Sequence, residues 1–379
     1  MGIKLTLLIV FFVVMVAVGL YSRKHARSVD GFVLGGRSVG PWLTAFAYGT
    51  SYFSAVVFVG YAGQFGWKYG LASTWIGIGN AVLGSLLAWV VLGRRTKVMS
   101  QHLKSKTMPD FFGERYGSKA LKIMASAIVF VFLVPYTASI YNGLSRLFEM
   151  AFDIPYTYCV VVMAVFTGIY VILGGYMATA INDFIQGIIM LIGIVAVIAA
   201  VLSGQGGFIE AVRKMAELPS DVPVTMGQPG AFTSFFGPDP LNLLGVVILT
   251  SLGTWGLPQM IHKFYTIRSE KAIATGTVIS TIFAIVISGG SYFLGGFGRL
   301  FDGPAIYNGN GGIAYDTIIP AMLSGLPDIL IGIVVMLVLS ASMSTLSSLV
   351  LTSSSTLTLD FIKGNLVKDM KDRTQLILM

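Results

Sequence analysis

The chain has 379 residues, of which 55% are hydrophobic and 11% charged, and its formal net charge is +8. This composition excludes an ordinary soluble globular domain, and a single cysteine excludes a disulfide framework. There is no Walker loop, no dinucleotide-binding fingerprint and no His/Cys metal cluster, so the sequence predicts no enzyme.

Nine hydrophobic segments are long enough to cross a bilayer as helices. Continuous apolar runs favour helices over a β-barrel, whose strands would alternate. The first segment lacks a small-residue cleavage site, so we expect a retained helix and not a signal peptide. The predicted spans cover residues 3–21, 41–65, 72–93, 119–145, 154–175, 180–203, 241–262, 272–298 and 326–359.

The distribution of Lys and Arg predicts the orientation of these spans. The loops placed inside are 22–40, 94–118, 263–271 and 360–375, together with Lys119 and Lys122 at the inner end of the fourth span. We therefore expect a multi-pass protein of the cell membrane, with its N-terminus outside and its C-terminus cytoplasmic. The positive charge is then a topology signal, not a sign of nucleic-acid binding. All but six of the 25 Lys and Arg residues fall inside, Lys263 among them; those outside are Lys4, Lys68, Arg146, Arg213, Lys214 and Arg299.

The second span is interrupted in mid-membrane by poor helix formers, Gly49-Thr50-Ser51-Tyr52-Phe53-Ser54. The seventh span is interrupted in a matching way by Gly253 to Gln259, which includes Pro258. Unwound backbone at membrane depth is tolerated where it faces protein or a water-filled cavity. Paired breaks of this kind indicate a transporter binding site, and kinking for packing is the alternative.

Asp183 is the only ionisable side chain between Asp153 and Glu210. A carboxylate in a hydrocarbon-spanning segment costs roughly 2.5–3.5 kcal/mol, so it requires a partner or a function. One interpretation is a cation or proton site near a helix start, and the other is a residue that caps the following helix.

The ninth span carries a run of hydroxyl side chains, from Ser340 to Ser348. At 3.6 residues per turn, Ala341, Ser344, Thr345 and Ser348 line one face. Hydroxyl and carbonyl oxygens on this face would suit a hard cation such as sodium. Hydrogen bonds back to the helix's own carbonyls, together with close packing, are the alternative.

At these residues the chain resembles the sodium/solute symporter family, which includes sodium/proline, sodium/galactose and sodium/sialic acid transporters. The resemblance covers essentially the whole chain. Its motifs are Gly35 to Trp42, Met108 to Tyr116, Gly174 to Gln186, Gly256 to Gln259, and Met343 to Ser347 with Asp360.

The resemblance implies an all-α fold, the five-plus-five inverted repeat of the LeuT type preceded by one extra helix. We expect residues 1–379 to form one transmembrane transporter domain. Family members continue for further helices, so the second repeat is expected to be incomplete here.

The resemblance also implies binding residues. A sodium ion would be held by Thr50, Phe53, Ala341, Ser344 and Thr345, and a second by Asp183, Ser344, Ser347 and Ser348. The solute would contact Tyr52, Ser54, Tyr136, Trp255, Pro258 and Gln259. Two features depart from the sodium/proline pattern: Tyr52 stands where that transporter has an aspartate, and Thr250 and Thr254 stand where it has an aromatic pair.

Together these observations predict a sodium-coupled symporter that imports a small organic solute, such as an amino acid like proline or a monocarboxylate, by alternating access. Sodium would be the coupling ion and the lipid bilayer the surroundings. The alternative is a transporter-like membrane sensor input domain, which a C-terminal kinase or receiver extension would reveal. A channel would need charge rings or a filter loop, and neither is visible. The sequence leaves the solute, the number of sodium ions and the oligomeric state open.

Overall fold

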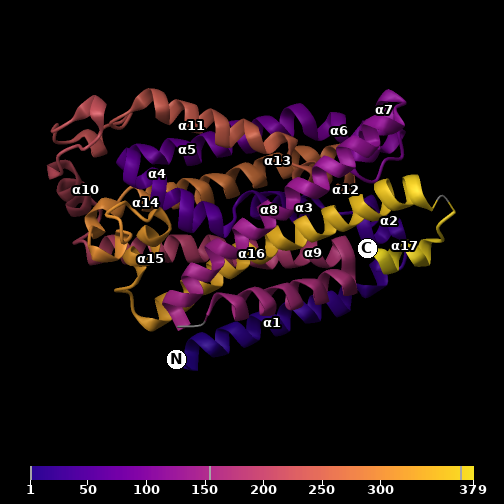
Figure 1. Cartoon of the computed structure of the whole chain (residues 1–379), viewed down its shortest axis with the longest axis horizontal. Coiled ribbons are helices and arrows are strands. Elements are labelled where there is room, and N and C mark those ends of the chain that lie inside the picture. The colour runs from indigo at the N-terminus through magenta and orange to yellow at the C-terminus, as the bar shows by residue number, and fades with distance from the viewer. Residues whose placement is uncertain (1, 153–154, 368) are drawn as a thin grey trace.

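A computed structural model describes residues 2–152, 155–367 and 369–379. Over these residues the chain is helical, with two isolated bridges and no strand. The long helices run roughly along the longest axis of the molecule (Figure 1). In chain order they are α1 (Gly2–Ser22), α2 (Val29–Leu34), α3 (Pro41–Tyr52), α4 (Ala62–Tyr69), α5 (Thr74–Gly79), α6 (Arg94–His102), α7 (Met108–Tyr116), α8 (Lys119–Phe152), α9 (Tyr156–Gly204), α10 (Phe208–Glu217), α11 (Pro240–Leu252), α12 (Pro258–Thr266), α13 (Glu270–Ala284), α14 (Gly290–Gly295), α15 (Ile318–Leu323), α16 (Asp328–Ser355) and α17 (Asp372–Leu378).

Wide, π-type turns extend several of these helices. They cover Val56–Tyr61, Asn80–Leu86, Trp89–Gly93, Ile285–Gly289 and Thr356–Leu366. Within the described residues, six helices are long and apolar enough to cross a membrane, or seven if α11 and α12 count as one bent span. The predicted spans coincide with helical segments, apart from short non-helical stretches at the breaks and near some span ends, and apart from residue 154, which lies outside the described part of the chain.

The helix starts follow from local sequence. The side chains of Thr107, Asp239 and Ser269 accept hydrogen bonds from backbone N–H groups in the first turns of α7, α11 and α13. Pro41 and Pro258 stand at the first positions of α3 and α12, where a missing N–H costs nothing.

Both predicted breaks are present. The first broken helix stops at Tyr52, Phe53 has extended backbone (φ −100°, ψ 111°), and the helix resumes at Ala55. In the second, the turn Gly253–Gly256 separates α11 from α12, and the two helices are bent by 53°. The interruptions expected from poor helix formers are therefore real changes of direction in the backbone.

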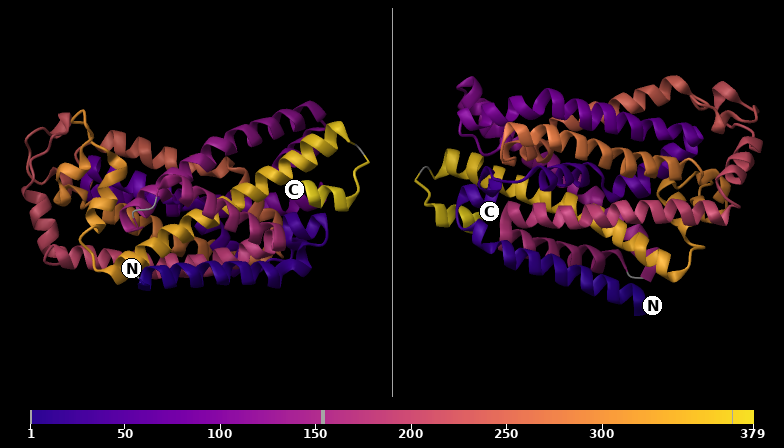
Figure 2. Two further views of the ribbon diagram at one scale, coloured as in Figure 1. Left: turned by 60° about the horizontal axis from the view of Figure 1, so that its bottom comes forward. Right: turned by 180° about the vertical axis from the view of Figure 1, so that it is seen from behind.

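The fifth and sixth predicted spans are the two arms of α9, which reverses at Gly175 (Figures 1 and 2). Gly175 has φ +54° and ψ −146°, a conformation that only glycine adopts readily. A Cβ at this position would lie 2.7 Å from the Phe32 carbonyl oxygen. The reversal therefore depends on glycine both for its dihedral angles and for the close approach of α2.

The connecting segments gather at the two ends of the bundle. Helices α10, α14 and α15 lie at one end, and α6, α7 and α17 lie at the other (Figure 1). The first group includes or adjoins loops predicted to be outside, and the second includes or adjoins loops predicted to be inside. The alternation of predicted loops thus agrees with the fold.

Helix α16 lies at the centre and packs against α9, α8, α1 and α3. Its hydroxyl run from Ser340 to Ser348 is buried throughout. Helix α1 lies along one edge of the bundle, against α9 and α16 (Figure 2). The hydroxyl face of the ninth predicted span is therefore turned toward other helices.

Candidate functional site

The end of α3 meets the hydroxyl face of α16. The Ser344 and Thr345 hydroxyls lie 3.3 and 3.5 Å from the Thr50 carbonyl oxygen. They also lie 3.1 and 3.0 Å from the Ala341 carbonyl oxygen. All four residues are fully buried.

The break in the first broken helix explains why the Thr50 carbonyl is available. The last four carbonyls of a helix have no partner within that helix, and Thr50 is in the last turn of α3. Phe53, the first residue to leave the helix, still donates its backbone N–H to the Gly49 carbonyl at 3.2 Å. Four of the five predicted ligands of the first sodium therefore converge, and Phe53 closes the same helix end.

This oxygen cluster has the chemistry of a site for a hard monovalent cation. It contains two hydroxyls and two carbonyls, and none of them carries a formal charge. Hydroxyls that now donate to carbonyls can rotate and turn their lone pairs toward an ion. Sodium can thus be accommodated without burying an unpaired charge on the protein.

A second buried cluster surrounds Asp183. This residue lies eight positions beyond the Gly175 reversal, inside the second arm of α9, and it is fully buried. Neither carboxylate oxygen accepts a hydrogen bond from the described residues. The helix-cap interpretation is therefore wrong, because a cap would accept a backbone N–H at a helix start.

Asp183 has a charged partner that the sequence did not indicate. The Lys263 ammonium nitrogen lies 3.7 Å from Asp183 Oδ2. The prediction counted Lys263 among the inner-loop cations, and that assignment is wrong, because α12 extends to Thr266 and Lys263 is only 1% exposed. The charge argument assumed that the carboxylate is alone in the membrane segment, and the structure shows that it is not.

The serines predicted for the second sodium have different partners. Lys263 donates a hydrogen bond to the Ser348 hydroxyl at 2.9 Å, and Ser348 lies 3.0 Å from the Ser51 hydroxyl on α3. Ser347 donates to the Ser344 carbonyl of its own helix at 3.0 Å. Asp183 and Ser348 therefore meet through the lysine.

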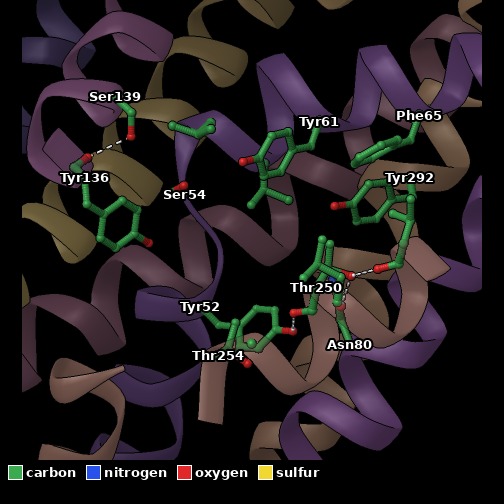
Figure 3. A pocket seen from close by; sticks show the side chains of 15 residues that line it. Tyr52, Ser54, Tyr61, Phe65, Asn80, Tyr136, Ser139, Thr250, Thr254 and Tyr292 are labelled. Atoms are coloured by element: carbon green, nitrogen blue, oxygen red, sulfur yellow. Dashed lines mark hydrogen bonds between the residues drawn. The ribbon is translucent and has the colours of Figure 1, made fainter. Parts of the chain in front are cut away.

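A cavity of about 370 Å³ adjoins the first broken helix (Figure 3). This volume lies in the range of small-molecule sites. Tyr52, Ser54 and Tyr136, three of the six predicted solute contacts, line it. The other lining residues are Val56, Val57, Tyr61, Phe65, Asn80, Ser139, Val246, Leu249, Thr250, Gly253, Thr254 and Tyr292.

Polar groups in the cavity wall are fixed by hydrogen bonds. Asn80 Oδ1 accepts bonds from the Thr250 and Ser251 hydroxyls at 3.0 and 3.1 Å. The Tyr52 hydroxyl donates to the Thr250 carbonyl at 2.9 Å. Sequence analysis missed Asn80 and Tyr292, although Asn80 is an isolated amide within an apolar span and could have been singled out.

The remaining three predicted solute contacts do not line the cavity. The Trp255 indole donates to the Leu83 carbonyl at 2.9 Å, and Pro258 begins α12. Gln259 is buried, and its side-chain oxygen and nitrogen have no hydrogen-bond partner among the described residues.

The described residues that line the cavity include no Asp, Glu, Lys, Arg or His. Its wall is mostly apolar and aromatic, with hydroxyl and amide groups at a few points. Such a cavity favours a small amphipathic molecule whose net charge is low or is balanced by a bound ion.

Comparison with known proteins gives consistent matches over this chain. Residues 32–379 match the profile of the Sodium:solute symporter family. The sodium/proline symporters of Staphylococcus aureus strains JH9 and COL are each 33% identical over 367 residues, which is 93% of this chain and 67% of the relative.

A solved structure of the substrate-bound outward-open state of a Na+-coupled sialic acid symporter has the same fold. The TM-score is 0.80 at 16% sequence identity, over 99% of this chain and 77% of the other. The expected fold, the LeuT type with an inverted repeat, is confirmed by this likeness.

Proposed function

Since this chain belongs to the sodium:solute symporter family, we propose that it couples sodium entry to the import of a small organic solute by alternating access. The observation that carries the proposal is that the first cation cluster and the cavity share one helix break. Thr50 belongs to the cluster, and Tyr52 and Ser54, which flank the break at Phe53, line the cavity.

Coupling follows from this shared backbone. An ion bound between Thr50, Ala341, Ser344 and Thr345 would fix the end of α3 against α16. That would also fix the positions of Tyr52 and Ser54 in the cavity wall. Whatever the ion adds to solute affinity, the solute adds equally to ion affinity, because binding free energies are linked.

The solute that we propose is a compact amino acid, such as proline, or a short monocarboxylate. The sodium/proline symporters among the relatives support the first. The absence of charged side chains among the described lining residues supports both, because sodium at the adjacent cluster could balance a solute carboxylate. Thr250 and Thr254 stand where the sodium/proline pattern has an aromatic pair, so this part of the cavity wall also suits a solute other than proline.

The proposed solute contacts are Tyr52, Ser54 and Tyr136 in the cavity, joined by Trp255, Pro258 and Gln259 when the second broken helix moves. Gln259 supports this movement, because a buried amide without partners is costly unless another state satisfies it. The bend of 53° between α11 and α12 is a suitable hinge.

The membrane orientation that we propose puts the N-terminus outside and the C-terminus in the cytoplasm, in one domain. A membrane-impermeant thiol reagent tests it on intact cells, in a background where Cys159 is replaced. A cysteine at exposed Asn310 should be labelled, and one at exposed Gln101 should not. The opposite labelling pattern would contradict the orientation.

Uptake by the purified protein in liposomes tests the function. An inward sodium gradient should drive accumulation of one labelled solute from a panel of amino acids and short carboxylates. Replacing external sodium with choline, or collapsing the gradient with a sodium ionophore, should abolish accumulation. Equal uptake with and without sodium would refute coupling.

A further inference from the structure

Lys263 is a fully buried cation in a place where the sequence predicts a second sodium ion. It is 1% exposed and comes from α12, the second half of the second broken helix. Its contacts are Asp183 Oδ2 at 3.7 Å and Ser348 Oγ at 2.9 Å, both from the set of oxygens expected to bind sodium. The lysine therefore supplies the positive charge that a buried carboxylate requires.

We propose that the Lys263 ammonium is the resident cation of this second site, and that transport is consequently coupled to one sodium ion per solute. The inference rests on the proposed function, whose number of coupling ions it determines. The four oxygen-bearing residues Asp183, Ser344, Ser347 and Ser348 become a sodium site only when the ammonium is removed.

Charge is the first reason. Asp183 and Lys263 together are neutral, whereas a sodium ion added to the pair would leave one uncompensated positive charge in a buried cluster. Asp183, Ser348 and Ser347 are each at most 3% exposed, so water cannot screen that charge. Sodium at the first cluster would also be a buried positive charge, but among the described residues its hydroxyls contact only carbonyls, so that ion would not lie against an ammonium group.

Geometry is the second reason. A sodium ion would need the Asp183 carboxylate and the Ser348 hydroxyl, and the ammonium already contacts both. An ion bound to these oxygens would therefore lie in direct contact with the ammonium group. The two cations repel most strongly where water is excluded.

The position of Lys263 is also fixed from other sides. Its ammonium lies 5.3 Å from the centroid of the Tyr176 ring, a distance at which an aromatic face attracts a cation. The Tyr176 hydroxyl in turn accepts a hydrogen bond from Thr266, three residues along α12, at 2.9 Å. The lysine is thus held against α9 and cannot easily leave for solvent.

The tethered cation also connects the two broken helices. Lys263 on α12 bonds to Ser348 on α16, and Ser348 bonds to Ser51 on α3. Ser51 follows Thr50, whose carbonyl belongs to the first cation cluster. A fixed ammonium can therefore hold α12 and α3 together, a role that a second sodium ion would otherwise perform.

The test measures the number of sodium ions per solute for the protein reconstituted in liposomes. The membrane voltage at which a fixed solute gradient stops net flux gives this number, and ²²Na⁺ binding to the purified protein gives it independently. The variants are Lys263→Met, which removes the charge from an unbranched side chain, Lys263→Arg, which keeps the charge, and the neutral pair Asp183→Asn/Lys263→Met.

One sodium ion is expected for the wild type, for Lys263→Arg and for the neutral pair, and two for Lys263→Met. At a tenfold sodium gradient without voltage, the limiting accumulation should rise from about tenfold to about a hundredfold in Lys263→Met, because each coupled ion contributes one factor of ten. Two ions in the wild type would overturn the inference, and so would a single ion in folded Lys263→Met.

The neutral pair keeps the test decisive if Lys263→Met does not fold, because replacing both members of a buried ion pair is commonly tolerated. A pair variant that matches the one-ion wild type supports the inference, and one that binds fewer ions than the wild type overturns it. Loss of all sodium dependence in the wild type would instead refute the proposed function, so the two failures are distinguishable.

Discussion

Replacing Thr345 with alanine tests the first cation cluster most directly. The Thr345 hydroxyl is one of two side-chain oxygens next to the Thr50 carbonyl, at 3.5 Å, and it donates to the Ala341 carbonyl at 3.0 Å. Its removal takes one oxygen from a proposed sodium shell and leaves the backbone carbonyls in place. We expect weaker sodium binding with little change in solute selectivity.

The magnitude follows from the type of interaction lost. A hydrogen-bond-like contact between a buried polar group and a charge contributes about 1.5–3 kcal/mol. The hydroxyl-to-Ala341 hydrogen bond is also lost from the ion-free protein, where it contributes only about 0.5–1.5 kcal/mol, so its loss offsets only part of the loss in sodium binding. At 1.4 kcal/mol per factor of ten, the sodium concentration for half-maximal uptake should rise about ten- to a hundredfold.

The assay is initial uptake of labelled solute into liposomes over a range of sodium concentrations, with choline replacing sodium. Thr345→Ser retains the hydroxyl and should behave like the wild type. Ser342→Ala is the matched control, because Ser342 is equally buried on α16 and its hydroxyl bonds to the Val338 carbonyl at 2.7 Å. If Thr345→Ala and Ser342→Ala leave the sodium dependence equally unchanged, the hydroxyl face is only a packing surface.

Two further predictions concern glycines. Gly84→Ala should raise the solute KM several-fold at unchanged sodium dependence, because a Cβ there would lie 2.5 Å from the Tyr52 hydroxyl oxygen in the cavity wall. Adding Tyr52→Phe to this variant should restore part of the uptake. If uptake is not restored, the contact with Tyr52 is not the cause. Gly175→Ala should lower the stability of the detergent-solubilised protein by at least about 1–3 kcal/mol, the cost of a non-glycine residue in a glycine-only conformation, with further cost from the contact with Phe32. Gly168→Ala, with open space around its Cβ position, should leave the melting temperature within about a degree of the wild type, and equal effects of the two substitutions would contradict the argument.

The helical spans, the two breaks and the hydroxyl face could be predicted from the sequence because each depends on residues close together in the chain. A run of apolar side chains has to span the bilayer as a helix, since no other open structure satisfies its backbone there. Pro258 cannot continue a helix that precedes it, and the poor helix formers before Phe53 weaken theirs. The convergence of Thr50 with Ser344 and Thr345 was predictable only through the resemblance to a family, because nothing local to residue 50 specifies contact with residue 344.

The partner of Asp183 and the composition of the cavity were decided by the tertiary structure alone. From the sequence, Lys263 is assigned to an inner loop directly after an apolar run, but the bend at Gly253–Gly256 redirects α12, and the Lys263 side chain contacts α9 and α16. The packing of α11 against the Asn80–Leu86 segment likewise brings Thr250 next to Asn80, which is 170 positions earlier in the chain. Charges and hydrogen-bonding groups that must be satisfied inside a membrane protein find partners by spatial proximity, and proximity between distant segments is set by how the broken helices pack.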